Sequence, residues 1–362
     1  MRVLVVNAGS SSIKLSLLGP CDEALGEREL TVTDEAVDQA LLAAALGALE
    51  GADAVGHRIV HGGERFSAAV RIDRSVESDL RALIELAPLH QARSLAAFDA
   101  VSLALPGVPG VACFDTAFHT TISAAATTYA LPAAWRERWP LRRFGFHGLS
   151  HAYVARRAAE LVGGERDDLR LVSAHLGAGA SLCAIAGGRS IDTTMGFTPL
   201  EGLVMATRSG SVDPGMLLWL ADGRLPASAL AHGLEHEAGL LGLAGSADMR
   251  EVLRSAESGD RSAAIALDVY THRLRGGIAT MAAALGGIDV VAFTGGVGQN
   301  APAVRERAVG GLGFLGIGLD KARNRTLTGD ADVTSDGATA RVLVVEARED
   351  LEIARQTRAL LA

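Results

Sequence analysis

The first segment with residues suited to chemistry is a run of small polar residues between two apolar stretches, VLVVNAGSSSIKLSLL, at positions 3–18. A plain hairpin needs only a pair such as Asn-Gly at its turn. Here Asn7, Ser10, Ser12 and Lys14 stand in or beside the turn, and Lys14 is one of only two lysines among 34 basic residues. Because successive N–H groups and hydroxyls can cradle an anion, we predict that this turn faces a phosphate.

Three later segments place cations among glycines, where backbone and ligand can come close. They are GHRIVHGGE with Arg58, RRFGFHGLSH with Arg142, Arg143 and His147, and TRSGSVDPG with Arg208. A structural ion pair explains any single segment equally well. Three of them on different parts of the chain favour a convergent anion site.

A second glycine-rich turn, TGGVGQNA, follows an apolar strand and precedes a helical pattern. Gly296, Gly298 and Ala301 match the GxGxxA dinucleotide fingerprint, so a dehydrogenase is an open alternative. A single match is weak, and little chain remains after it for a complete nucleotide-binding sheet. Both interpretations place a nucleotide at the start of a helix.

Asp115 directly follows the apolar run VACF. Ligands of open α/β sheets bind outside the carboxyl ends of strands, which favours a functional role, although a helix N-cap is the competing interpretation. His232 and His236 have the spacing of a zinc pair. Gly233 replaces the glutamate of an HExxH motif and no third ligand is near, so we interpret both as surface histidines.

These residues need regular elements to hold them, and the hydrophobic pattern predicts an α/β fold. Strands are expected at 2–6, 13–18, 54–60, 108–114, 171–176, 181–186, 190–194, 290–293 and 341–345. Helices are expected at 36–49, 75–86, 91–105, 152–162, 216–220, 263–285 and 351–361. The order strand, small-residue turn, strand occurs at Arg2 and again at Arg170, which predicts a duplicated domain with mixed sheets. A Walker-type phosphate loop is excluded because the first turn returns into a strand.

Composition narrows the class of protein. The chain has 362 residues, 49% of them hydrophobic and 21% charged, which fits about two globular domains. A net charge of -8 argues against nucleic acid or an anionic membrane as the main partner. Three widely spaced cysteines, no signal-peptide pattern and no long apolar run predict a cytoplasmic protein.

Taken together, these motifs resemble the acetate kinase family, within the actin-like, sugar kinase and Hsp70 superfamily. The matching pieces run nearly from end to end: NAGSSSIK, GHRIVHGG, LAPLH, FDTAFH, RRFGFHGLSH, HLGAGAS, TPLEG, TRSGSVDPG, GLLGLAGSADMR, FTGGVGQNA and EDLEIARQT. The resemblance implies duplicated actin-like ATPase (ribonuclease H-like) domains with an interdomain cleft that holds the ligands. The first would span 1–119 plus 351–362, and the second, 120–350, would bind the nucleotide and form a homodimer.

The activity implied by the resemblance is reversible phosphoryl transfer between ATP and acetate, with Mg²⁺ or Mn²⁺, by direct in-line attack. Arg58 and Arg208 would bind the carboxylate and the phosphoryl group, and His147 would donate to a phosphoryl oxygen. Asp115 would orient the arginines or the metal site. Asn7 and Glu349 would lie at the metal ion.

The resemblance also implies two sets of binding residues. The apolar pocket for the methyl group would be formed by Val60, Leu89, Phe146 and Pro199. The nucleotide and its phosphates would be held by Ser10, Ser12, Lys14, His175, Gly177, Gly179, Asp248, Met249, Arg250, Gly296, Val297, Gly298, Gln299 and Asn300. The chemistry agrees, because a carboxylic acid is already ionised at pH 7 and needs no general base.

The chain departs from the family pattern at several positions. Ala178 replaces a usual Asn, Gln299 a usual Glu and Leu149 a usual Thr, while EAREDL replaces a usual Thr-Asn-Glu-Glu-Leu. Two alternatives therefore stay open beside the dehydrogenase. One is a kinase for propionate or another short-chain acid, and the other is a nucleotide-binding protein that has lost turnover.

Overall fold

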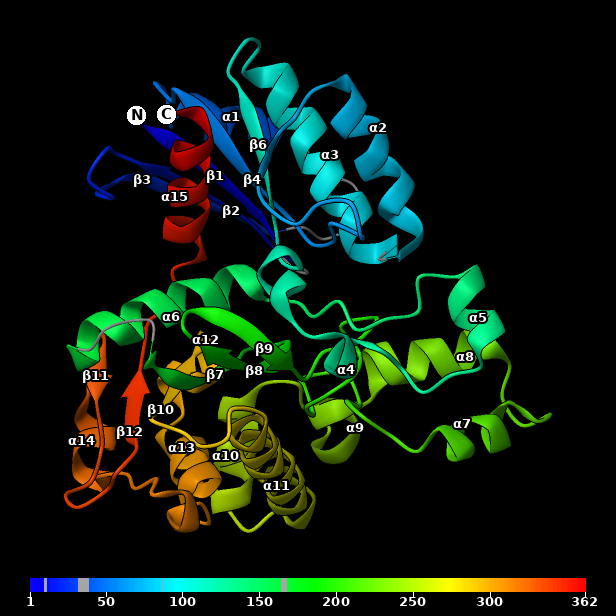
Figure 1. The fold of residues 1–362 in the computed structure, drawn as a ribbon, viewed down its shortest axis with the longest axis vertical. Coiled ribbons are helices and arrows are strands. Elements are labelled where there is room, and N and C mark those ends of the chain that lie inside the picture. The colour runs from blue at the N-terminus through cyan, green and yellow to red at the C-terminus, as the bar shows by residue number, and fades with distance from the viewer. Residues whose placement is uncertain (10–11, 32–38, 87, 164–167) are drawn as a thin grey trace. The chain divides into compact units, whose positions relative to one another are not determined.

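The computed structural model of the chain describes residues 1–9, 12–31, 39–86, 88–163 and 168–362. These residues form two compact units (Figure 1). The first unit comprises Met1–Thr120, Phe146–Tyr153 and Arg348–Ala362, and the second comprises Thr121–Gly145 and Val154–Ala347. Within the described ranges, no helix combines the length and apolar character that crossing a membrane requires.

The first unit is built on a six-stranded mixed sheet with the order β3-β2-β1-β4-β6-β5. Its strands are β1 (Val3–Ala8), β2 (Ser12–Leu18), β3 (Ala24–Thr31), β4 (Ala54–Ile59), β5 (Val70–Arg71) and β6 (Gly110–Phe114). Strands β1, β4 and β6 run parallel, and the other three pair antiparallel to their neighbours. The predicted N-terminal hairpin is confirmed as β1 and β2, with Asn7 inside β1 rather than in the turn.

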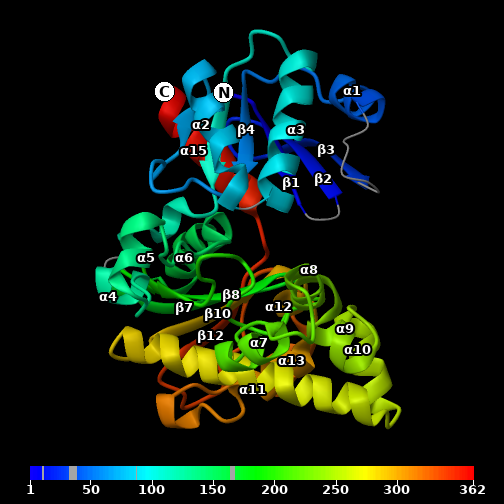
Figure 2. The same ribbon diagram turned by 90° about the vertical axis from the view of Figure 1, so that its right-hand side faces the viewer.

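Helices cover both faces of this sheet, as Figure 2 shows. On one face, α1 (Gln39–Gly47) and α3 (Pro88–Ala104) bury the apolar side chains of alternate strand residues such as Leu4 and Val6. On the other face, α15 (Glu349–Leu361) packs through Ile353 and Ala354 on Val3, Val5, Leu18, Val111 and Cys113. The end of the chain therefore completes the core of the unit that contains its beginning.

The second unit repeats this architecture. Its strands are β7 (Arg170–Leu176), β8 (Ala180–Ala186), β9 (Arg189–Thr193), β10 (Val290–Thr294), β11 (Ala331–Asp332) and β12 (Arg341–Val344). Their spatial order, read from β9, is β9-β8-β7-β10-β12-β11. It corresponds strand by strand, in order and in direction, to the first sheet. The predicted α/β class with duplicated mixed sheets is thereby confirmed.

Helices surround and connect the two sheets. The remaining ones are α2 (Arg74–Ala82), α4 (Ala124–Thr127), α5 (Ala133–Arg138), α6 (Gly148–Val162), α7 (Pro214–Ala221), α8 (Ala227–His232), α9 (Gly239–Ala244), α10 (Met249–Glu257), α11 (Arg261–Ala284), α12 (Gly295–Asn300), α13 (Pro302–Val309) and α14 (Lys321–Thr326). The long helix α11 packs along β7, β8 and β9. Helix α6 begins in the first unit and continues in the second from Val154.

Several elements differ from the sequence-based expectation. Strand β3, ALGERELT, was not predicted because its largely exposed residues, with three charged ones in succession, lack apolar alternation, as is typical of an edge strand. The helix expected at 152–162 begins four residues earlier, at Gly148, where GLSH gives no apolar period. Residues 36–38 of the helix expected at 36–49 lie outside the described residues, and α1 covers Gln39–Gly47.

Two buried histidines make the stability of the first unit depend on pH. Burial lowers the pKa of His57, on β4, to about 3 and that of His61 to about 4. Both are neutral in the folded chain but would titrate near pH 6.5 when unfolded. Because the unfolded chain then binds more protons, stability decreases as the pH falls below about 6.5.

We expect the free energy of unfolding to fall by about 2 kcal/mol per buried histidine between pH 7 and pH 5. Denaturant titrations at both pH values measure this for the native chain, for His57→Leu and for His232→Ala, whose imidazole is 61% exposed. His57→Leu should remove about 2 kcal/mol of the decrease, whereas His232→Ala should not change it. An identical decrease in all three proteins would contradict the assignment.

Candidate functional site

The register of the first sheet brings together residues that are distant in the sequence. Val6 on β1 pairs with His57 on β4, so Asn7 and Arg58, the next residues, lie side by side with their side chains on one face. Asp115 follows β6, where its backbone N–H donates to the carbonyl of Ile59 at 3.0 Å. Glu349 is the first residue of α15, the helix covering this face. The site thus lies at the carboxyl ends of three parallel strands.

Hydrogen bonds join these four side chains into one network. Arg58 donates to Asp115 Oδ2 from Nη2 at 2.7 Å and from Nε at 3.0 Å. Its Nη1 donates to Asn7 Oδ1 at 3.0 Å, and Asn7 Nδ2 donates to Glu349 Oε2 at 2.9 Å. The distance between Arg58 Nη1 and Glu349 Oε2 is 3.8 Å. The plane of the guanidinium is therefore held from three directions.

The network is largely withdrawn from water, because side-chain exposure is 14% for Arg58 and 2% for Asp115. Burial raises the pKa of Asp115, and the adjacent Arg58 opposes that rise. Burial lowers the pKa of Arg58, but the carboxylates of Asp115 and Glu349 outweigh this and raise it. Asp115 Oδ1 is buried and has no hydrogen-bond partner among the described residues. Such an unpaired oxygen is costly unless a ligand or ion uses it.

His147 stands in an unusual backbone conformation beside this network. Its φ of 57° lies in the left-handed region, which only Asp22 shares among the described non-glycine residues. The next residue, Gly148, begins α6 and donates its N–H to the Asp115 carbonyl at 2.9 Å. A Cβ on Gly148 would overlap that carbonyl oxygen. His147 therefore lies in a strained turn, and the hydrogen bond from the next residue to the Asp115 carbonyl holds that turn in place.

Buried apolar residues stand near the charged network in the first unit. Val60 is 7% and Phe146 1% exposed. The carbonyl of Phe146 is 2.9 Å from His119 Nε2, and its ring meets His61 edge to face at 5.6 Å between centroids. Of the four predicted pocket residues, Leu89 lies in α3, with its side chain outside the described residues. Pro199 belongs to the second unit.

The N-terminal turn is described only in part. Ser10 lies outside the described residues. Ser12 Oγ donates to Glu29 Oε1 at 2.8 Å, and Lys14 Nζ is 3.9 Å from the same oxygen. The Lys14 side chain is 61% exposed. In this structure both predicted phosphate ligands are paired across the sheet with Glu29.

In the second unit, two glycine turns lie at the carboxyl ends of neighbouring strands. His175 on β7 is paired with Thr294 on β10, and Gly177 N donates to Gly179 O at 2.9 Å in the turn after β7. Gly295, with φ of 77°, starts α12, where a Cβ would lie 2.6 Å from Leu176 O. The predicted turn-to-helix at TGGVGQN is thus present, and α12 carries all five residues from Gly296 to Asn300.

Arg305 is a residue that sequence reasoning missed. It is 1% exposed, and its guanidinium donates to the carbonyls of Gly298 and Gln299 at 2.7 Å and to Asn324 Oδ1 at 2.6 Å. Burial lowers its pKa to about 10. A cation used in this way fixes the end of α12. The only sequence signal is an arginine on the apolar side of VRERAV.

Another part of the predicted nucleotide set caps a helix. Asp248 is the N-cap of α10 and accepts a hydrogen bond from Arg250 N at 2.9 Å. The guanidinium of Arg250, whose side chain is 86% exposed, also donates to the Asp248 carboxylate. These hydrogen bonds with Arg250 lower the pKa of Asp248. Met249 is buried. The Asp248–Arg250 pair is therefore a rigid, exposed feature at a helix start.

The predicted cations of the second unit have different environments. Arg208 Nη1 donates to Pro199 O at 3.4 Å, and burial lowers its pKa. Arg143 donates to backbone carbonyls and to Glu201 and is thus a structural residue. Asp213, in the same motif as Arg208, is the N-cap of α7. Of the cations in RRFGFHGLSH and TRSGSVDPG, we therefore retain Arg208 and His147 as candidates.

A divalent ion is the cofactor that the first-unit network would suit. The described residues include no group of three metal-ligating side chains, so the protein alone does not form a cage. Mg²⁺ is commonly held by one or two carboxylates, with waters and substrate phosphates completing its shell. Asp115, with its unpaired buried oxygen, and Glu349, 13% exposed beside Asn7, fit that pattern.

Comparison with known proteins identifies relatives along nearly the whole chain. The sequence model of the acetokinase family matches residues 35–355. An acetate kinase of Leifsonia xyli subsp. xyli is 46% identical over 387 residues, covering 98% of this chain and 97% of its own. An acetate kinase of Deinococcus radiodurans is 44% identical over 391 residues, covering 100% and 98%.

Solved structures agree with the sequence relatives. The acetate kinase of Porphyromonas gingivalis superposes with a TM-score of 0.91 at 36% identity, covering 100% of both chains. A propionate kinase from Francisella tularensis subsp. tularensis superposes with a TM-score of 0.91 at 33% identity, covering 99% of both chains.

The docking of α6 on Asp115 can be tested by adding one methyl group. Gly148→Ala should destabilise the chain by about 1–3 kcal/mol, because the new Cβ must displace the Asp115 carbonyl. Gly233→Ala is the matched control, since Gly233 has helical φ and ψ and nothing within 4 Å of an added Cβ. Thermal unfolding of both variants measures the difference. Equal stabilities would show that the helix start has room to move.

Proposed function

This chain belongs to the acetokinase family, and on that premise we propose that it transfers a phosphoryl group reversibly between ATP and acetate, giving acetyl phosphate and ADP. The observation that carries the proposal is the buried network of Arg58, Asp115, Asn7 and Glu349 at the carboxyl ends of β1, β4 and β6. A fixed guanidinium beside carboxylates suits a reaction in which two anions must meet. The dehydrogenase interpretation of TGGVGQNA is set aside by the family membership.

The chemistry requires cations and oriented donors more than a base. Acetate is ionised at neutral pH, so its oxygen can attack the γ-phosphate directly. The barrier arises from repulsion between the carboxylate and the phosphates and from charge on the group in transfer. We propose direct in-line transfer without a phosphoenzyme, with stabilisation by preorganised charges.

We assign three side chains to the reacting groups. Arg58 and Arg208 bind the carboxylate and the transferring phosphoryl, and His147 donates to a phosphoryl oxygen. Asp115 acts through Arg58, because its carboxylate receives both Nε–H and Nη2–H and so sets the plane of the guanidinium. Planar, bidentate donors suit carboxylate and phosphate recognition better than an ammonium does.

Mg²⁺ completes the proposal. Asp115, Glu349 and Asn7 are the residues that would hold it, directly or through water. When bound with ATP, the ion neutralises phosphate charge and so favours attack by an anion. This chain's own residues supply the orientation, since Asn7 bridges Arg58 and Glu349 through its amide.

The nucleotide is assigned to the glycine turns of the second unit. Gly177, Gly179 and the helix α12, with its residues Gly296–Asn300, provide backbone that a phosphate or ribose can approach closely. Arg305 supports this assignment because it locks the carbonyls of α12. Ala178, between the two glycines, lacks the amide donor usual there, which would slow transfer rather than redirect it.

Propionate is the second candidate substrate, favoured by the similarity to the propionate kinase of Francisella tularensis. Val60, Leu89, Phe146 and Pro199 are proposed to bound the alkyl group. One methylene discriminates between acids by only about 1–3 kcal/mol, so both acids can be substrates. Acetate is our first choice because Val60 replaces a smaller residue in the pocket.

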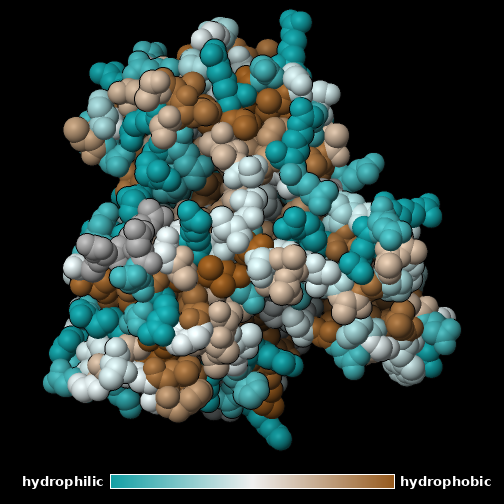
Figure 3. Space-filling view, viewed as in Figure 1, coloured by the Kyte–Doolittle hydropathy of each residue, from teal (hydrophilic) through white to brown (hydrophobic). Residues whose placement is uncertain are grey.

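A homodimer and a cytoplasmic location are also proposed. The second unit exposes a nearly all-apolar helix, α7, with no buried residue, and Met216, Leu218 and Trp219 are 43%, 73% and 58% exposed. Figure 3 shows brown apolar surface where Figure 1 places α7. A second copy of the chain would cover it. The three free cysteines support a reducing compartment.

Acyl phosphate formation tests the enzymatic proposal. Purified chain, ATP and Mg²⁺ are incubated with acetate, propionate or butyrate, and product is trapped with hydroxylamine. We expect product with acetate and a loss of about 10²–10³-fold in Arg208→Ala, as for other transition-state donors. Arg323→Ala, an exposed arginine on α14, is the control that should retain activity. ATP binding without product from any acid would instead support the nucleotide-binding protein that has lost turnover.

The dimer is tested by light scattering after gel filtration. Leu218→Glu should convert a dimer to a monomer, because a charge would be buried in the interface. Leu103→Glu on α3 is the matched control, since Leu103 is equally exposed at 75% but lies in the first unit. A monomeric native chain, or dissociation by both variants, would contradict this interface.

A further inference from the structure

One segment of the second unit carries a substrate-pocket residue but is not regular structure. It is the loop 194–202 after β9, which we call the pocket loop, and it includes Pro199 and the TPLEG motif. Glu201 of this motif has no role in the site as described above. Neither do Tyr129 and Arg143, which lie earlier in the chain. The structure brings these three side chains together.

Hydrogen bonds join both Tyr129 and Arg143 to Glu201, and we call these three residues the clamp. Tyr129 OH donates to Glu201 Oε2 and accepts from the N–H of Phe197 at 3.0 Å. Arg143 Nη2 donates to Glu201 Oε1 at 2.9 Å. Both carboxylate oxygens of Glu201 are thus engaged, one by a phenol and one by a guanidinium.

The clamp also holds the backbone of the pocket loop at its start. Arg143 Nη1 donates to Thr194 O at 3.1 Å and to Met195 O at 3.0 Å. Gly196 O accepts from Phe144 N at 3.0 Å. A Cβ on Gly196 would overlap both Glu201 and the Tyr129 hydroxyl, so these two side chains pack directly against this glycine. Both ends of the loop are therefore tied to the segment 129–144.

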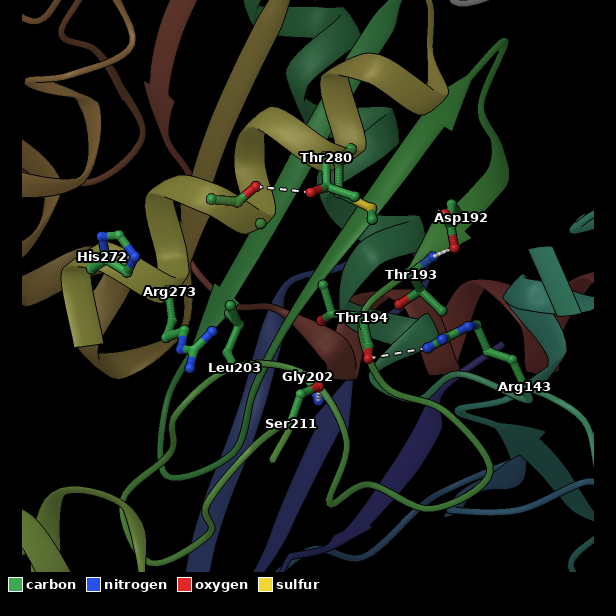
Figure 4. Close-up of a pocket in the computed structure, with 13 residues that line it drawn as sticks. Arg143, Asp192, Thr193, Thr194, Gly202, Leu203, Ser211, His272, Arg273 and Thr280 are labelled. Carbon is green, nitrogen blue, oxygen red and sulfur yellow. Dashed lines mark hydrogen bonds between the residues drawn. The ribbon is translucent and has the colours of Figure 1, made fainter. Parts of the chain in front are cut away.

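One side of this loop borders an open cavity. The cavity, of about 410 Å³, is lined by Arg143, Thr194, Gly202 and Leu203 on one side and by α11 on the other. Figure 4 shows Arg143 reaching the carbonyl of Thr194 at its edge. The hydrogen bonds from Arg143 hold the loop at the edge of this cavity, in addition to the packing of its buried residue Met195.

The pocket loop also contacts the proposed substrate-binding residue Arg208. Pro199 O accepts from Arg208 Nη1 at 3.4 Å. Gly202, the last residue of the loop, exchanges two hydrogen bonds with Ser211, at 3.1 Å and 2.9 Å. A shift of the pocket loop would therefore move Pro199 and the guanidinium of Arg208 together.

We propose that Tyr129, Arg143 and Glu201 are positioning residues that set the substrate pocket, and hence the preference among short-chain carboxylates. The inference rests on the proposed function, in which Pro199 bounds the alkyl group and Arg208 binds the acid. The clamp residues themselves touch no reacting atom. They act through the pocket loop on binding of the acid. We expect a smaller effect on the nucleotide turns, of which the one after β7 is joined to Ala206 by a hydrogen bond of 3.1 Å to Ala178 O.

Three conservative variants test this: Tyr129→Phe, Arg143→Lys and Glu201→Gln. Each should raise KM for acetate about tenfold, the effect of losing a hydrogen bond to a charged group. The ratio of kcat/KM for acetate over that for propionate should fall by about 3–10-fold, because a loosened wall admits an extra methylene. KM for ATP should stay within about twofold of the native value. A general loss of stability would lower the apparent kcat for both acids, because less enzyme is folded, and would alter neither the KM values nor the ratio.

Hydrogen exchange separates the failure of this inference from a failure of the proposed function. The amide of Phe197, bonded to Tyr129 OH, should exchange at least about tenfold faster in Tyr129→Phe, whatever the activity. Faster exchange and an unchanged substrate ratio in an active enzyme would overturn the role in selectivity. Unchanged exchange would overturn the clamp. Native chain that forms no acyl phosphate would refute the function and, with it, the selectivity claim.

Discussion

The buried ion pair between Arg58 and Asp115 is the constraint on which the first unit depends. Removing two charges from water is costly, and the pair is stable only because the guanidinium has further partners in Asn7 and Glu349. That requirement dictates which elements must meet: three parallel strand ends, the start of α15 and the start of α6. A buried ion pair alone contributes little to the free energy of folding. In this site the pair fixes the orientation of the planar Arg58 guanidinium.

The repeated sheets show how one architecture supports two kinds of site. In the first unit, the carboxyl ends of the central strands carry charged side chains. In the second, the equivalent ends of β7 and β10 carry glycines, and the cation Arg305 lies behind the turn and donates to its carbonyls. The same strand order therefore carries a network of charged side chains in one copy and glycine turns in the other.

Much of this followed from the sequence, because apolar periodicity and glycine turns are local signals. The hairpin of β1 and β2, the strand before Asp115 and the turn before α12 were all predictable. Strand β3 was not, since edge strands need little apolar surface, and Arg305 was not, since burial of a cation depends on acceptors that only the folded turn brings to it. The pairing of Ser12 and Lys14 with Glu29 also depends on cross-strand register, which the predicted elements did not include.

The dependence of the first unit on α15 has a consequence for biosynthesis. Asn7 and Glu349 are separated by 342 positions yet share a hydrogen bond, and the same helix covers Val3, Val5 and Leu18. During synthesis, this apolar face of the sheet must therefore stay uncovered until the residues of α15 have left the ribosome. Contacts of such long sequence separation form late and slowly. Val3 and Val5 therefore reach their native packing only after α15 has been synthesised, and until then their apolar face is exposed to chaperones.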